Sequence, residues 1–97
     1  MATREENKTR LQRDAVRLIR FRYPLLTELS LMPRNGPQVT AFNQLETWIG
    51  LVMTELATQA DAVDATVDPD TGDGIQLDEA TLVAADPGLV LVDFVRL

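Results

Sequence analysis

A long apolar rhythm between residues 38 and 65 constrains the fold of this 97-residue chain more than any other feature. Its hydrophobic residues recur at alternating spacings of three and four, interrupted only by Gln59; they are Phe42, Leu45, Ile49, Val52, Leu56 and Val63. This spacing places the side chains along one stripe of a helix. The sequence therefore predicts a helix of roughly 40 Å over about 38–65.

Three further residues of this segment fall outside the stripe. Trp48 and Leu51 are large and apolar, so we predict that the helix contacts something on a second side and treat both as candidate interaction residues on its outer face. Gly50 costs about 1 kcal/mol relative to Ala in a helix interior. It indicates either a close helix–helix contact or a position without a special role.

A second helix is predicted over about 3–22. Thr3 and Glu6 have the spacing of a capping box, in which each side chain accepts a hydrogen bond from the other residue's backbone amide. An apolar arc with helical periodicity follows, formed by Leu11, Ala15, Leu18 and Ile19. Pro24 disfavours helical geometry in the residue before it, so the helix is expected to end near Arg22.

A turn is predicted at residues 32–37, between the two helices. Two prolines and an Asn-Gly pair exclude regular structure there. The two helices would then form a long antiparallel hairpin. We favour packing of the apolar stripe against residues 11–23 of the same chain, and packing against other chains is the alternative.

A small β element is predicted over about 75–97. Residues 89–97 have the composition of a strand, whereas 81–85 fit either a strand or a helical turn capped by Asp78. Together with the hairpin, this element predicts an α+β fold that is mainly helical. The length of the chain predicts a single domain comprising residues 1–97.

The end of the predicted β element is a candidate docking segment. Val90, Val92 and Phe94 would lie on one face of the strand, and the opposite face is also apolar. A strand with two apolar faces requires cover on both sides, and an exposed apolar edge would aggregate. We therefore expect the strand either to be covered by the helices or to be added to a partner's sheet.

An acidic loop over about 66–74 precedes this element. Asp68, Asp70 and Glu79 have the spacing of the first, third and twelfth ligand positions of a calcium-binding EF-hand loop. Gly72 and Asp73, however, stand in the reverse of the order that the bend of such a loop requires. We interpret the loop as a solvated acidic turn without a firm metal site, and weak calcium binding is the alternative.

Charge is divided unevenly along the chain. Residues 1–22 contain seven of the nine basic residues, whereas 55–97 contain ten acidic residues and one Arg. The first helix carries an arginine stripe, which consists of Arg10, Arg13, Arg17 and Arg20. Guanidinium groups bind carboxylates and phosphates, but a pI near 4.4 is unlike that of a nucleic-acid-binding domain. The stripe is predicted to pair with acidic groups of this chain or a neighbour, and phosphate contact is the alternative.

The composition excludes several classes of function. The chain has no Cys and no His, which removes thiol chemistry, Ser–His pairs and zinc sites with His or Cys ligands. No pattern brings two carboxylates together in an apolar pocket, so we name no catalytic residues and expect neither an enzyme nor a cofactor. No apolar run is long enough to span a bilayer, and we expect no membrane contact.

These features predict a non-enzymatic protein–protein interaction or assembly subunit with protein partners, forming a homo-oligomer or part of a larger assembly. A phage or virion component is one setting that suits the size and charge layout; otherwise the protein is expected to be soluble and intracellular. A small regulator that binds nucleic acid or a nucleic-acid-binding protein is the first alternative. A weak calcium-binding module is the second.

Overall fold

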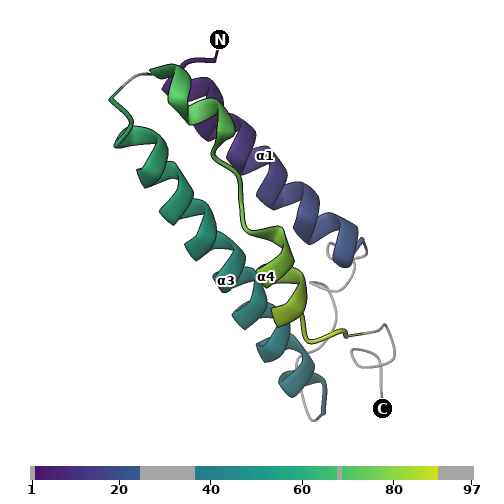
Figure 1. The fold of residues 1–97 in the computed structure, drawn as a ribbon. Coiled ribbons are helices and arrows are strands. Elements are labelled where there is room, and N and C mark those ends of the chain that lie inside the picture. Colours follow the sequence, from purple (N-terminus) through teal and green to yellow (C-terminus); the bar gives the residue numbers. More distant parts are fainter. Residues whose placement is uncertain (1, 25–36, 68, 90–97) are drawn as a thin grey trace.

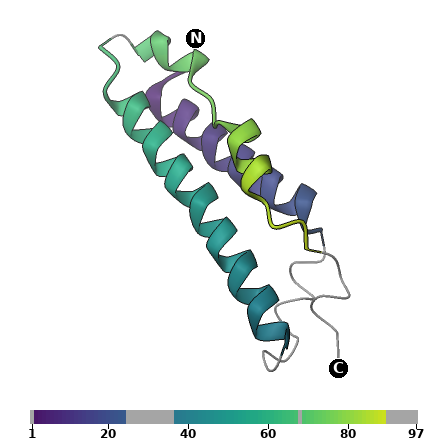
Figure 2. The ribbon, with the colours of Figure 1, turned by 60° about the horizontal axis from the view of Figure 1, so that its bottom comes forward.

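The computed structural model describes residues 2–24, 37–67 and 69–89. Within them the backbone forms three α-helices and one 3-10 helix, namely α1 (Arg4–Arg22), α3 (Pro37–Asp64), η1 (Pro69–Gly74) and α4 (Glu79–Ala85). α1 and α3 lie side by side and run antiparallel (Figure 1). The segment from η1 to α4 runs back along these two helices, and η1 contacts both of them while α4 contacts α3 (Figures 1 and 2).

α1 begins at the predicted capping box. The Thr3 hydroxyl accepts a hydrogen bond from the Glu6 amide at 3.1 Å, and the Glu6 carboxylate accepts one from the Thr3 amide at 3.4 Å. Arg20 and Arg22 lie in the last turn, where positive charge complements the helix dipole. The helix ends before Tyr23, whose backbone leaves the helical region as its position before a proline favours.

The hydrophobic core lies between the inner faces of α1 and α3. Its buried members on the two helices are Leu11, Ala15, Leu18, Ile19, Ala41, Phe42, Leu45, Trp48, Val52 and Val63. Tyr23, Leu77 and Leu82 add to the core from outside these two helices. Ile49 and Leu56 pack at its margin and are partly buried. The apolar stripe of α3 thus packs against α1 within the same chain, as the sequence favoured.

The predicted β element is absent from residues 75–89. This part of the chain contains no strand, and the described residues form a mainly helical structure, so the prediction of an α+β fold is wrong here. The second half of the predicted element, including Val90, Val92 and Phe94, lies outside the described residues, as does the predicted turn at 32–37.

The preference for helix at α4 has a local and a tertiary cause. The Asp78 carboxylate caps the helix by accepting hydrogen bonds from the Thr81 amide at 3.3 Å and the Thr81 hydroxyl at 2.7 Å. Leu82 is buried in the hydrophobic core. A short capped helix forms part of its backbone hydrogen bonds within the segment itself, whereas a lone strand at this position would need a second strand to pair with.

η1 occupies most of the predicted acidic loop and is held by the first turns of α1. The Asn7 side chain is buried and donates a hydrogen bond to the Asp73 carboxylate at 2.9 Å. A Cβ atom at Gly72 would lie 3.1 Å from the Asn7 amide nitrogen. The Gly-Asp order that fails the calcium-loop pattern therefore fits a close approach of this turn to α1.

Candidate interaction surfaces

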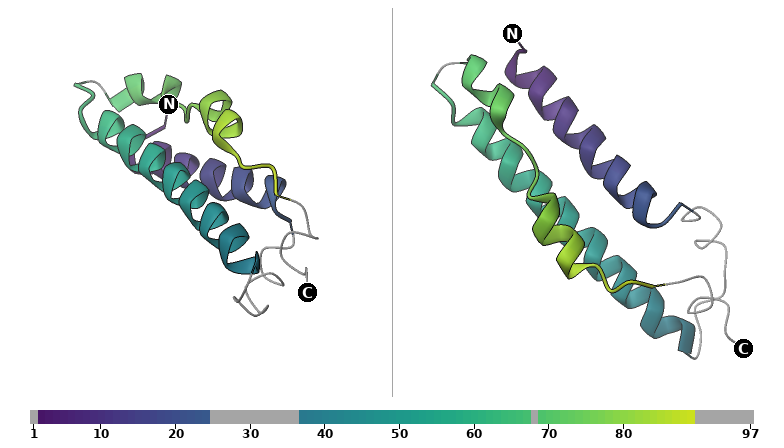
Figure 3. Two further views of the ribbon diagram at one scale, coloured as in Figure 1. Left: turned by 90° about the horizontal axis from the view of Figure 1, so that it is seen from below. Right: turned by 45° about the vertical axis from the view of Figure 1, so that its right-hand side comes forward.

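The outer face of α1 carries an exposed patch of cationic and apolar side chains. This α1 patch consists of Arg13, Val16, Arg17, Arg20 and Phe21, which line one shallow depression of about 460 Å³. Phe21 is 78% exposed and Val16 is 44% exposed. α3 and the η1–α4 segment lie on one side of α1, and no described helix covers the other side (Figure 3, right).

The arginines of the α1 patch have no counter-charge within the described part of the chain. No hydrogen bond or ion pair joins Arg13, Arg17 or Arg20 to another described residue. Arg10, the fourth member of the predicted stripe, differs from them. It donates to the Ile75 carbonyl at 2.7 Å and pairs with Asp14 at 3.9 Å. The structure therefore divides the stripe into one anchoring arginine and three that have no partner among the described residues.

The basic residues at the start of α1 also have structural partners. The Arg4 guanidinium donates to the Thr66 carbonyl. The Lys8 ammonium lies 3.1 Å from the Asp64 carboxylate and 3.2 Å from that of Glu5. Hydrogen bonds to Asp64 and then Glu5 raise the pKa of Lys8. These cations hold α1 against the C-terminal end of α3 and leave little free positive charge there.

A clamp of three side chains joins the other end of α1 to the end of α4. The Asp86 carboxylate, only 2% exposed, accepts a hydrogen bond from Arg22 Nε at 2.5 Å and one from the Tyr23 hydroxyl at 2.5 Å. The Gly88 amide donates to the same carboxylate at 2.9 Å. The clamp fixes the end of α1 that carries Phe21.

The clamp shifts the pKa of two of its members. Burial acts to raise the pKa of Asp86, but the hydrogen bonds from Tyr23, the Gly88 amide and Arg22 outweigh it, so this pKa lies below its ordinary value of 3.8. Burial, and then the hydrogen bond to Asp86, raises the pKa of Tyr23 to about 12. Asp86 therefore stays ionised, and Tyr23 stays neutral, over a wider pH range than these side chains usually do.

Trp48 is not an exposed interaction residue, which corrects the assignment made from the sequence. It is 1% exposed, its indole nitrogen donates to the Leu82 carbonyl at 2.8 Å, and its ring packs edge-on against Tyr23 with centroids 5.5 Å apart. The second contact of α3 is α4 of the same chain. Leu51 remains 45% exposed at the edge of that contact.

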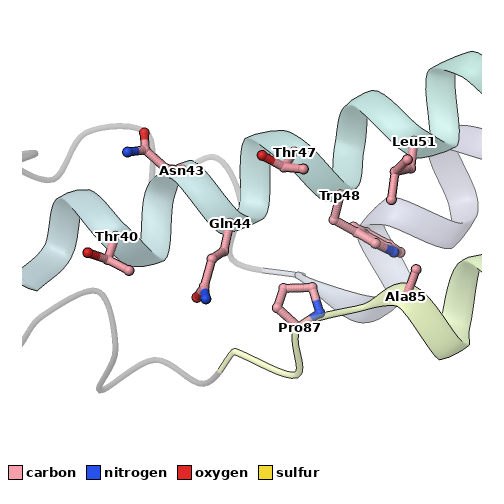
Figure 4. A pocket seen from close by; sticks show the side chains of 8 residues that line it. All are labelled: Thr40, Asn43, Gln44, Thr47, Trp48, Leu51, Ala85 and Pro87. Carbon is pink, nitrogen blue, oxygen red and sulfur yellow. The ribbon is translucent and has the colours of Figure 1, made fainter.

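A groove of about 390 Å³ runs between α3 and the end of α4. It is lined by Thr40, Asn43, Gln44, Thr47, Trp48, Leu51, Ala85 and Pro87. Leu51 and Trp48 point toward Ala85, whereas Gln44 extends from α3 on the same side as Pro87 without pointing at it (Figure 4). None of these side chains titrates, so the groove offers hydroxyl, amide and apolar contacts and no acid–base chemistry.

Two other sequence hypotheses concern Gly50 and calcium. A Cβ atom at Gly50 would meet nothing within 4 Å, so this glycine marks no close helix contact among the described residues. Those residues also contain no group of acidic side chains that could hold a metal ion. Glu79 begins α4 with an exposed side chain, whereas Asp68 and the side chain of Asp70 lie outside the described part.

Sequence reasoning missed three residues that the structure makes important. Phe21 lies off the apolar arc of α1 and beside the arginines, so helical periodicity alone could have identified it as exposed. Asn7 and Asp86 carry no such signal. Each joins segments more than sixty residues apart, and no local pattern encodes that pairing.

Comparisons with known proteins provide no relative. No family model matches the chain, and neither does any curated protein or solved structure. Among the described helices, none has an apolar stretch sufficient to cross a bilayer.

Proposed function

We propose that this protein is a non-enzymatic interaction subunit that binds an acidic protein surface through the α1 patch. The observation that carries this proposal is the exposure of Phe21 among three arginines without partners in the described chain. An oligomeric complex, such as a phage or virion assembly, is a setting in which such a subunit would operate.

The charge of the patch favours an anionic partner. Three guanidinium groups lie within about 12 Å of helix, the rise from Arg13 to Phe21. The protein as a whole carries a formal charge of −6. No described acidic side chain pairs with the arginines of the patch, so a carboxylate-bearing surface can form charge-assisted hydrogen bonds there without displacing a partner among the described residues.

The apolar residues of the patch favour a protein over a simple polyanion. Phe21 and Val16 offer apolar contact area, which only a partner with apolar side chains of its own can bury. Aromatic residues and arginines are also the side chains that most often dominate protein–protein binding energy. A partner that combines acidic and aliphatic side chains on one helical face would match both properties.

Single-stranded nucleic acid is the second candidate, and Phe21 is the observation that favours it. An exposed aromatic ring beside arginines can stack on a base while the guanidinium groups contact phosphates. The overall negative charge disfavours this candidate, because electrostatic attraction to phosphates supplies most non-specific affinity for nucleic acid.

Binding of defined probes to the isotopically labelled protein tests the proposal by NMR. The first probe is a synthetic helical peptide of roughly 15 residues with Glu and Leu on one face. The second has Ala in place of Leu, and the third is a thymidine oligonucleotide of similar length. We expect the Glu/Leu peptide to bind most tightly, with a Kd on the order of 10⁻⁴ M at low salt, and to shift signals of residues 13–21.

A charge-matched pair of variants controls this experiment. Combining Arg13→Gln, Arg17→Gln and Arg20→Gln should abolish peptide binding. Combining Asn43→Asp, Thr47→Glu and Thr54→Glu lowers the net charge equally on exposed positions of α3 and should leave most of the binding intact. Tighter binding of the oligonucleotide than of either peptide would establish the second candidate. No binding by any probe would refute the proposal.

A further inference from the structure

Because α1 and α3 pack antiparallel, the basic and acidic segments of the sequence lie toward different ends of the folded molecule. Lys8 pairs with Asp64, which places the start of α1 beside the end of α3. Tyr23 packs on Trp48, which places the end of α1 beside the first half of α3. The α1 patch therefore lies toward one end of the molecule, and the acid-rich segment 55–79 begins near the middle and extends to the other end (Figure 1).

The described part of the acid-rich segment carries exposed carboxylates without described partners. It contains no Lys or Arg, and its described acidic side chains are Glu55, Asp61, Asp64, Asp73, Asp78 and Glu79. Several of them have partners, such as Asp64 with Lys8 and Glu55 with the Asp78 amide at 2.7 Å. Asp61 and Glu79 are exposed, and no hydrogen bond or ion pair joins them to another described residue.

The α1 patch and Asp61 lie on outward-facing sides of two different helices. The α1 patch faces away from α3, because Leu11, Ala15 and Leu18 occupy the face of α1 that packs on it. Asp61 lies two residues before the buried Val63, which puts it on roughly the opposite side of α3. Because the packed core fixes both helices, the α1 patch and Asp61 cannot pair with each other within one molecule, whereas they can pair between two molecules.

We infer that the α1 patch of one copy binds the exposed carboxylates of a second copy that have no partner among the described residues, Asp61 and Glu79, which we call its acidic face. This inference rests on the proposed function and names the acidic partner surface. Patch and acidic face are complementary in sign, and a second copy always supplies the complement at equal concentration. Like charge excludes direct pairing of two α1 patches.

The arrangement of the two surfaces determines the type of assembly. The patch and Asp61 face outward from different helices, so each copy that receives a neighbour on its patch keeps its acidic face free. Such a head-to-tail contact extends into a chain or closes into a ring rather than ending at a two-fold dimer. The patch is small relative to a standard interface, so each contact is weak and reversible.

Sedimentation equilibrium of the full chain tests this inference. We expect the average mass of the wild-type protein to exceed the 10.8 kDa monomer at about 1 mM protein and low salt, rising with concentration beyond that of a dimer. In about 0.5 M salt, where charges are screened within a few ångströms, it should return to the monomer mass. A monomer at every concentration in low salt would overturn the inference.

A mixing experiment makes the test specific for head-to-tail contact. The first variant combines Arg13→Gln, Arg17→Gln and Arg20→Gln and retains only the acidic face. The second combines Asp61→Asn and Glu79→Gln and retains only the patch. Each variant alone should be monomeric. Their mixture should form a 1:1 dimer and nothing larger, because only one functional contact remains.

The possible failures separate this inference from the proposed function. If the wild-type protein is monomeric but the Glu/Leu peptide binds residues 13–21, the patch binds an acidic partner that is not a second copy. If neither association nor peptide binding occurs, both proposals fail. If the mixture of variants grows beyond a dimer, the contact is not the one inferred and the inference is wrong.

Discussion

The two faces of α1 differ in almost every physical property although they share one helix. The inner face presents Leu11, Ala15 and Leu18, all buried against α3. The outer face presents the α1 patch, with arginines that lack partners in the described chain and a phenyl ring in solvent. The inner face therefore determines stability, whereas the outer face contributes little to it and is free to bind another molecule.

The same division explains why the basic residues of α1 are not equivalent. Arg4, Lys8 and Arg10 bond to η1, its flanking residues or the end of α3, and Arg22 bonds to Asp86. The arginines between these anchors have no such contacts. The position of a basic residue along α1, more than its type, therefore decides whether it bonds within the protein or is available to a partner.

Truncation of a buried leucine on the inner face should have the largest effect on stability. Leu11→Ala removes buried methyl groups and leaves a cavity, so it should lower the free energy of unfolding by about 2–5 kcal/mol. Val16→Ala on the outer face of the same helix is the control and should change it by less than about 0.5 kcal/mol. Chemical denaturation measures both. Equal losses would contradict the division of the two faces.

Loss of the clamp should have the next largest effect. Asp86→Asn replaces a carboxylate oxygen with an NH₂ group that cannot accept a hydrogen bond from Arg22, and this should cost about 1–3 kcal/mol of unfolding free energy. Asp61→Asn, at an exposed position, should be nearly neutral. A stability unchanged by Asp86→Asn would mean that the clamp does not hold α4 to α1.

The same clamp should give stability a pH dependence of smaller size. Because the pKa of Asp86 is lowered in the folded protein, its contribution is complete above about pH 5 and is lost as the pH falls below about 4. Because the pKa of Tyr23 is raised to about 12, its contribution is lost between about pH 10 and 12. The loss of unfolding free energy at low pH should be absent in Asp86→Asn, and the loss at high pH should be absent in Tyr23→Phe. If the unfolding free energy of each variant changed with pH in parallel with that of the wild type, neither Asp86 nor Tyr23 would be the source of the pH dependence.

The smallest effect on stability should accompany the replacement of Phe21. Phe21→Ser removes a ring that is mostly in solvent, so the free energy of unfolding should change by no more than about 0.5 kcal/mol. Binding of the Glu/Leu peptide should nevertheless weaken several-fold, because the ring supplies apolar contact. Thermal melting and NMR titration measure the two quantities separately. A large drop in melting temperature would show that Phe21 belongs to the folded core.

Local periodicity was sufficient to predict the long helices, whereas tertiary contacts decided the rest of the described fold. The capping box of Thr3 and Glu6 and the apolar stripe of α3 are encoded by neighbours within a few residues. α4 has only seven residues, and its sequence suits helix and strand alike. The burial of Leu82 and the hydrogen bond from Trp48 to its carbonyl favour the helix, and neither could be inferred from the segment alone.

The candidate site was predictable to a similar extent. Spacing identified the arginine stripe, but only the position of the η1 segment shows that Arg10 is bound and Arg13 is free. Trp48 was placed on an outer face because it lies off the apolar stripe, whereas its partners are Tyr23, just after α1, and Leu82 in α4, more than thirty residues away. Long-range contacts of this kind have no signature in a single sequence.

The amide NMR spectrum of the full chain as a function of protein concentration at low salt tests the central claim most directly. We expect concentration-dependent shifts at residues 13–21 and around Asp61 and Glu79, with the signals of Leu11, Leu18 and Val52 unchanged. The shifts should disappear when Arg13, Arg17 and Arg20 are all replaced by Gln. Shifts confined to core residues would contradict the assignment of the outer face of α1 as a binding surface. The absence of any shift, in a protein that also does not bind the Glu/Leu peptide, would contradict it as well.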